Sequence, residues 1–236
     1  MLQINNLTKI FNLDQPVENH KIALDDVSLH IEKGEFVTII GGNGSGKSTL
    51  MNMICGVHKP ESGTIFIDGV NVTKMSENAR AKYIGRVFQD PNMGTCGNMN
   101  IQENMELAIR RGKKKSLMWG FKKKNEIIFK EKLSLLGLGL ENRLEQKIGL
   151  LSGGQRQAIT LLMAALEEPK LLLLDEHTAA LDPKTAKIVL DITEKIVNQN
   201  NITTVMITHN MRDAIKYGNR LIMLSNGKII LDVKDE

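Results

Sequence analysis

A glycine-rich stretch, GGNGSGKS at residues 41–48, lies between two segments of different pattern. The residues before it, FVTII, form a short continuous apolar run, which is typical of a strand buried on both faces of a parallel sheet. After it, apolar side chains recur at helical spacing, at Leu50, Met53, Ile54 and Val57. A strand, a glycine turn and a helix in this order predict the first unit of an α/β fold, with backbone amides gathered where the helix begins.

The other apolar patterns extend this fold class. LLLLD and TTVMIT repeat the short continuous run, whereas residues 2–4 and 27–31 alternate as half-buried strands do. Asp-Gly in GTIFIDGVNV and Asn-Gly in LIMLSNGKIILDV each separate two apolar runs and predict hairpins. We therefore expect an α/β core with a mainly parallel sheet and an antiparallel β portion at the N-terminal end.

One segment of the chain has no strand pattern, between about residues 92 and 150. Asn100 and Glu103 have the spacing of a capping box, which indicates a helix start. We expect a mostly helical subdomain inserted into the core. The predicted division is a first core part at 1–91, the helical subdomain at 92–165 and a second core part at 166–236.

The glycine-rich stretch also fits the phosphate-binding P-loop pattern, G-x-x-x-x-G-K-[ST]. Its glycines let several N–H groups face a phosphate, Lys47 adds a positive charge for the β- and γ-phosphates, and Ser48 offers a hydroxyl to Mg²⁺. The alternative is a glycine turn that binds nothing, but the flanking strand and helix are the context that the motif requires. The predicted nucleotide-binding residues of this loop are Gly41, Gly42, Asn43, Gly44, Ser45, Gly46, Lys47, Ser48 and Thr49.

The stretch LLLLDE ends an apolar run in two carboxylates, Asp175 and Glu176. Ligands bind at the carboxyl ends of central parallel strands, so we predict that Asp175 faces a metal ion. Glu176 is then placed to polarise a water molecule for attack on the γ-phosphate. Adjacent acids also occur at solvated strand ends, and it is the upstream P-loop that favours the catalytic interpretation.

A second glycine-rich stretch, LLSGGQ, precedes another helical pattern. Ser152 and Gln155 have capping-box spacing, which predicts that a helix begins here. Gly153 and Gly154 fall in its first turn, where each costs about 1 kcal/mol relative to alanine. We interpret this cost as a sign of function, because a helix N-terminus without Cβ atoms can contact a phosphate closely.

Together these motifs make nearly the whole chain resemble the nucleotide-binding subunit of an ATP-binding-cassette (ABC) transporter, which is a P-loop NTPase. LSGGQ matches that family's signature loop. The resemblance implies that Gln89 in VFQDP is the Q-loop glutamine, which touches Mg²⁺ or water, and that Asp182 in AALD belongs to the D-loop. It implies that His209 in MITHN contacts the γ-phosphate and that Phe11 in LTKIF stacks on adenine.

The resemblance thus implies a catalytic set and a metal set. The catalytic residues would be Glu176, His209 and Gln89, and the Mg²⁺ residues would be Ser48, Gln89 and Asp175. Two features depart from the family pattern. His177 follows Glu176 where the family usually has proline, and the segment DQPVENHK lengthens the loop after Phe11.

The resemblance also implies partners. In this family the signature residues, here Ser152, Gly153, Gly154 and Gln155, act on ATP held by a second copy, so that two chains enclose two ATP molecules about a two-fold axis. The dimer would lie in the cytoplasm, peripheral on the cytoplasmic membrane face, and power a separate membrane permease. No fused membrane domain precedes the cassette, which favours an importer with a substrate-binding protein. DEHTAALDP resembles cassettes of amino-acid-type uptake.

Other functions predict other sequences. A soluble ABC ATPase acting on nucleic acid or ribosomes would carry a long coiled-coil insertion or two cassettes in one chain. A phosphotransferase with a generic P-loop would leave LSGGQ unexplained, and an exporter subunit stays an alternative to the importer. We expect no nucleic-acid partner.

Charge is unevenly distributed along the chain. The net charge is +4, yet eight basic and no acidic residues lie between residues 110 and 124, which leaves the rest of the chain at −4. This basic run predicts a solvated loop, or contact with anionic headgroups or a membrane-embedded partner. Nucleic acid is a third alternative, less favoured because the rest of the chain is net acidic. The N-terminal residues lack a signal-peptide pattern, and no apolar run approaches the roughly 18 residues of a membrane span. Cys55 and Cys96 have neither metal nor disulfide spacing, as expected in a reducing cytoplasm.

Overall fold

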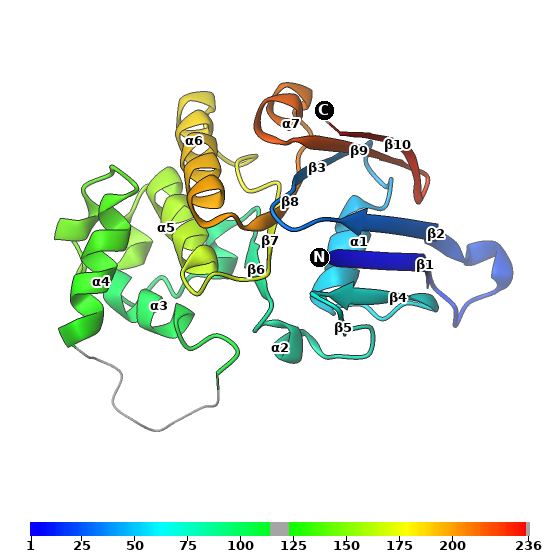
Figure 1. Ribbon diagram of the computed structural model, residues 1–236, viewed down its shortest axis with the longest axis horizontal. Coiled ribbons are helices and arrows are strands. Elements are labelled where there is room, and N and C mark those ends of the chain that lie inside the picture. The colour runs from blue at the N-terminus through cyan, green and yellow to red at the C-terminus, as the bar shows by residue number, and fades with distance from the viewer. Residues whose placement is uncertain (114–122, 235–236) are drawn as a thin grey trace.

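The computed structural model describes residues 1–113 and 123–234 and contains two sheets (Figure 1). The smaller sheet has the strand order β2-β1-β4-β5 and is antiparallel. Its strands are β1 (Leu2–Phe11), β2 (Lys21–Ile31), β4 (Ser62–Ile67) and β5 (Val70–Asn71). This is the expected N-terminal antiparallel portion.

The larger sheet has the order β10-β9-β3-β8-β7-β6. All of its neighbouring strands are parallel except the hairpin of β9 and β10. Its strands are β3 (Phe36–Ile40), β6 (Ile84–Val87), β7 (Leu171–Asp175), β8 (Thr203–Ile207), β9 (Arg220–Ser225) and β10 (Lys228–Lys234). The predicted α/β class with a mainly parallel sheet is confirmed.

Helices connect and cover these strands. The α-helices are α1 (Lys47–Cys55), α2 (Glu77–Arg80), α3 (Ile101–Ala108), α4 (Lys123–Ser134), α5 (Gly153–Ala165), α6 (Pro183–Asn200) and α7 (Met211–Tyr217). Short 3₁₀ turns occur at Val17–Asn19, Pro91–Gly94, Leu140–Asn142 and Ile148–Leu150. In Figure 1, α3, α4 and α5 gather at one end of the molecule and the antiparallel sheet lies at the other.

Two hydrophobic cores meet at the parallel sheet. Leu171 and Leu173 of β7 pack in a core shared with α1 and the antiparallel sheet. Leu172 and Leu174 point to the other face and pack in a core shared with helices α3 to α6. Because side chains alternate along a strand, burial on both faces requires an apolar residue at every position, which explains the unbroken run in the sequence.

Helix α1 is shorter than the apolar spacing predicts. Leu50, Met53 and Ile54 are buried, but Val57 lies outside the helix and is 45% exposed. The helix ends because Gly56 adopts a left-handed φ of 88° at its C-cap, which glycine alone adopts without a steric cost. The predicted fourth residue of the stripe was therefore wrong.

Most of the basic run lies outside the described part of the chain. Lys114, Lys115 and Lys122 are beyond the described residues, as are the side chains of Lys123 and Lys124. Among the residues described, Arg111 donates a hydrogen bond to the Ala164 carbonyl at 2.8 Å, and Lys113 contacts Glu167. Over the described residues, no helix has both the length and the apolar character needed to cross a membrane.

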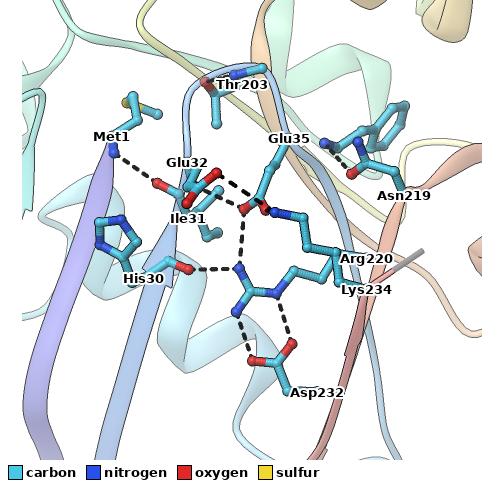
Figure 2. Close-up of polar contacts among 12 residues, drawn as sticks. Met1, His30, Ile31, Glu32, Glu35, Thr203, Asn219, Arg220, Asp232 and Lys234 are labelled. Atoms are coloured by element: carbon cyan, nitrogen blue, oxygen red, sulfur yellow. Dashed lines mark hydrogen bonds and ion pairs between the residues drawn. The ribbon is translucent and has the colours of Figure 1, made fainter. Parts of the chain in front are cut away.

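A network of charged side chains fastens the β9–β10 hairpin to the end of β2 (Figure 2). Arg220 donates two hydrogen bonds to Asp232, each at 2.7 Å, and further bonds to the His30 carbonyl at 2.7 Å and to Glu35 at 3.1 Å. The paired contact with Asp232 raises the pKa of Arg220. Burial acts to raise the pKa of Glu35, but its contacts with Lys234, the Glu32 amide and Arg220 outweigh burial and lower it.

Candidate functional site

The P-loop curls between β3 and α1, as its sequence predicts. Gly41, Gly44 and Gly46 have φ of 154°, 77° and 107°. At Gly46 a Cβ would also lie 2.6 Å from the Ala23 carbonyl oxygen, so this position needs glycine for space as well as for conformation. The loop therefore has the tight curvature of a phosphate-binding nest.

Lys47 is folded into this loop. Its ammonium group donates to the Gly41 carbonyl at 2.8 Å and to the Gly42 carbonyl at 3.0 Å, and its side chain is buried. The hydroxyl of Ser45 is also buried, with no hydrogen-bond partner among the described residues. A buried cation and an unpaired hydroxyl beside exposed loop amides fit an anionic ligand.

A cleft of about 430 Å³ opens over the P-loop, within the usual size range of small-molecule sites. It brings together residues from distant parts of the chain: Phe11, Asn12, Lys21, Ala23, residues 43–49, Glu176 and His209. Apart from Gly41 and Gly42, the cleft thus includes every residue predicted to bind ATP, together with two of the three predicted catalytic residues.

Phe11 ends β1 at one side of this cleft. The Lys9 ammonium lies 5.2 Å from the centre of its ring, and the His58 ring meets it edge-on with centroids 5.3 Å apart. These contacts hold a half-buried ring in the cleft wall, where an aromatic base could stack on it.

Glu176 and His209 contact each other at the edge of the sheet. Register pairs Asp175 of β7 with Ile207 of β8, so the residues after these two strands emerge side by side. The Glu176 carboxylate oxygen and His209 Nε2 are 2.6 Å apart. Glu176 has a left-handed φ of 47°, and its backbone N–H donates to the Ile207 carbonyl at 3.0 Å. Such a conformation costs about 1–3 kcal/mol in a residue other than glycine.

Asp175 and Gln89 lie in a neighbouring cleft of about 540 Å³ and not in the P-loop cleft. Arg86 shares this second cleft and donates to Asp175 at 3.0 Å. The three residues predicted to hold Mg²⁺ are therefore divided, because Ser48 lines the first cleft.

The donor chemistry nevertheless fits Mg²⁺. Hydroxyl, amide and carboxylate oxygens are hard ligands, and Mg²⁺ usually takes few protein ligands beside water and substrate phosphates. The described residues contain no cluster of three or more His, Cys, Asp or Glu side chains that could cage a metal by themselves. A site of this kind would depend on the phosphates for the rest of its ligands.

The signature residues cap α5 away from the cleft. Ser152 and Gln155 form the predicted capping box, with both bonds at 3.3 Å, and Ser152 and Gly153 are exposed. Gly154 is buried, and a Cβ there would lie 2.1 Å from the Thr185 methyl group of α6. The absence of a side chain at this glycine lets α6 pack closely against α5, a reason that the sequence did not suggest.

Asp182 caps α6, the helix that packs on α5. Its side chain accepts a hydrogen bond from the Thr185 N–H at 3.2 Å, and this contact lowers the pKa of Asp182. Because Gly154 of α5 lies against Thr185 of α6, the two helix N-termini are adjacent.

Sequence reasoning missed Arg86 as a site residue and left His177 without a role. The His177 ring lies 3.1 Å from the Thr193 hydroxyl, which itself donates to the Val189 carbonyl at 2.8 Å. The ring must therefore donate from Nε2, and burial lowers the pKa of His177 to about 4. The sequence signal for Arg86 was visible as a lone basic residue in the strand IGRV.

Comparison with known proteins adds independent information. Residues 24–179 match the family model described as ABC transporter. The chain is 48% identical to the tyrosine transport ATP-binding protein of Clostridioides difficile strain R20291, over 100% of this chain and 93% of that protein. It is 37% identical to the energy-coupling factor transporter ATP-binding protein EcfA2 of Clostridium tetani, over 98% of this chain and 78% of that protein.

Solved structures agree with these relatives. The chain resembles the ATP-binding cassette MJ0796, whose dimer is known in a post-hydrolysis state bound to ADP and Pi, with a TM-score of 0.81 and 32% identity over 100% of this chain and 99% of that one. It also resembles cbiO1 from Clostridium perfringens, part of the ABC transporter complex cbiONQ. The TM-score is 0.80, and the two chains are 25% identical over 99% of this chain and 88% of that one.

Proposed function

This chain belongs to the ABC transporter family as the ATP-binding, ATP-hydrolysing subunit of a transport system, and from that premise we propose that two copies of it close around two ATP molecules to power a separate permease. Each ATP would lie between the P-loop of one copy and the signature residues of the other. Closure on ATP and release after hydrolysis would then drive the permease.

One observation carries this proposal. The P-loop cleft is lined by the P-loop, Phe11, Glu176 and His209, and no signature residue is among its lining residues. At the chain's own α5 N-terminus, Ser152 and Gly153 are exposed and lie outside this cleft. A helix N-terminus attracts phosphate, so a second copy can supply the donors that this cleft lacks. The dimeric state known for the related MJ0796 cassette supports dimer formation by this chain.

The geometry suggests how each residue works. Lys47 is held by two loop carbonyls, and we propose that it turns to the β- and γ-phosphates when ATP binds. Glu176 is held by its turn and by His209, where it can accept a proton from an attacking water. His209 is about half exposed and can turn to the γ-phosphate once ATP is present. Ser48, Gln89 and Asp175 would hold Mg²⁺, which would neutralise phosphate charge.

A mixed dimer tests whether the signature acts across the interface. One chain carries Lys47→Ala, and the other carries Gly153→Asp, which places a carboxylate where the γ-phosphate is expected. Each homodimer then has two defective sites. In the mixture, both defects fall in one site, and the other site combines an intact P-loop with an intact signature.

We expect the mixture to recover ATP-dependent dimer formation, measured by size-exclusion chromatography with light scattering. Circular dichroism of each variant provides the folding control. If the mixture stays monomeric with both variants folded, the signature does not complete a partner's site.

We further propose that the transport system is an importer of an amino acid, with an aromatic one such as tyrosine as the first candidate. The support is the similarity to the tyrosine transport ATP-binding protein together with the methionine import protein MetN of Haemophilus influenzae, which is 34% identical over 98% of this chain. The subunit would work at the cytoplasmic face of the membrane, and a substrate-binding protein would act on the other side. We propose no nucleic-acid partner. Residues 92–165 would form the helical subdomain, and 1–91 with 166–236 the ATP-binding core.

The importer proposal can be tested directly. The membrane protein that co-purifies with the tagged chain is identified, and the two are reconstituted in vesicles with the binding protein encoded beside them. ATP-dependent accumulation of labelled tyrosine supports the proposal, and accumulation of another solute, or outward transport, overturns it.

A further inference from the structure

Arg86 is the basic residue that pairs with the predicted metal carboxylate. It lies on β6, next to and parallel with β7, and its Nη2 is 3.0 Å from Asp175 Oδ2. Both side chains are largely covered, with 15% and 18% of their areas exposed. A carboxylate in such a place is costly without a partner, and Arg86 is the partner that the structure provides.

Arg86 is held from three sides and so acts as a fixed charge. The same Nη2 donates to the Asn52 side chain at 2.9 Å, and the guanidinium carbon lies 4.6 Å from the centre of the Phe88 ring. Asn52 is on α1 one turn after Ser48, and Phe88 directly precedes Gln89. The guanidinium group therefore contacts the P-loop helix, the strand of Asp175 and the start of the predicted Q-loop.

A fixed positive charge beside a carboxylate competes with any cation that the carboxylate attracts. We propose that Arg86 is the resident counter-ion of Asp175 and that it weakens divalent-cation binding at this site. Arg86 is a positioning residue in this role, because it acts through Asp175. The inference rests on the proposed function, in which Asp175 takes part in holding Mg²⁺.

The physical advantage lies in the cation-free state. Without a cation, Arg86 would keep the Asp175 carboxylate paired, so that no unpaired charge is left in the sheet. A cation held by Asp175 would be bound less tightly, because it would share the carboxylate with a like charge.

The test measures metal binding without turnover. Mn²⁺ replaces Mg²⁺ as the probe, and its binding to the ATP-loaded chain is followed by the loss of the free-Mn²⁺ electron paramagnetic resonance signal. All proteins carry Glu176→Gln to prevent hydrolysis, and the chain is in excess over ATP. The compared variants are Arg86→Gln, Arg86→Lys, Asp175→Asn and Lys170→Gln.

Removing the charge with Arg86→Gln should tighten Mn²⁺ binding by about tenfold, the order expected when one neighbouring unit charge is lost from a half-buried site. Arg86→Lys keeps the charge and should bind Mn²⁺ like the parent. Lys170→Gln is the matched control. Lys170 lies directly before β7 and pairs with Asp68, so this substitution removes the same charge near the same strand. The Lys170→Gln variant should also bind Mn²⁺ like the parent.

The outcomes separate the two proposals. Asp175→Asn should weaken Mn²⁺ binding, and if it does not, the metal role of Asp175 fails. If Asp175→Asn weakens binding but Arg86→Gln leaves it unchanged or weaker, the counter-ion role of Arg86 is overturned. That role is also overturned if Arg86→Lys tightens binding as much as Arg86→Gln, since the charge would then not be the cause.

Discussion

Replacing Gly154 by alanine sets two physical effects against each other. In most helices, Gly→Ala stabilises by up to about 1 kcal/mol, because glycine loses more backbone entropy on folding. Here the new Cβ would lie 2.1 Å from the Thr185 methyl, well inside the 3.0 Å that Cβ contacts practically never fall below. Either Thr185 must rotate or α5 and α6 must separate.

We expect the steric cost of the new Cβ to exceed the gain in helix propensity. Overpacking a close contact costs about 1–3 kcal/mol against a propensity gain of up to about 1 kcal/mol, which leaves a net loss of up to roughly 2 kcal/mol. For a chain of this size, a loss of about 2 kcal/mol corresponds to a fall in Tm of about 4–8 °C. The measurement is thermal unfolding followed by circular dichroism, with nucleotide absent so that ligand binding does not contribute.

Two variants isolate the cause. Thr185→Ser removes the methyl group and keeps the hydroxyl, so Gly154→Ala combined with Thr185→Ser should recover most of the lost stability. Gly153→Ala is the matched control one residue earlier, because its Cβ would meet only the flexible end of Leu181 at 3.3 Å. We expect that control to be neutral or stabilising. A higher Tm for Gly154→Ala, or no recovery in the double variant, would refute the packing argument.

Three further predictions concern single residues. Lys47→Ala should abolish tight ATP binding in a calorimetric titration, and unchanged affinity would remove its phosphate role. Glu176→Gln should bind ATP but hydrolyse it about a hundredfold more slowly or worse, since a positioned base contributes at least that factor; a parental rate means that another group is the base. Because burial lowers the pKa of His177 from 6.5 to about 4, the unfolded chain takes up the proton first. Stability should therefore fall by about 3 kcal/mol as pH drops through this interval. His177→Asn should flatten that dependence in urea titrations, and an unaltered slope contradicts the assignment.

The fold class and most of the P-loop cleft follow from signals that lie close together in the chain. Glycine at 41, 44 and 46 permits positive φ, capping boxes mark the starts of α3 and α5, and Asn-Gly turns the β9–β10 hairpin. Unbroken apolar runs indicate strands that are buried on both faces. Backbone sterics and hydrogen bonds over a few residues decide all of these features, so one sequence determines them. The prediction that Val57 belongs to the helix was wrong, because the helix ends at the left-handed C-cap Gly56. That glycine is also a local signal, but it was not weighed against the apolar spacing.

Only the tertiary structure decided which side chains meet. Arg86 and Asp175 are 89 positions apart in the chain, and their contact depends on β6 pairing with β7 in one register. The close packing at Gly154 depends on how closely α6 approaches α5, and Asp175 and Gln89 line a cleft apart from the P-loop cleft, where Asp175 is paired with Arg86. Contacts of this kind are set by the packing of whole elements to within a fraction of an ångström, and a pattern of residue types carries no information at that scale.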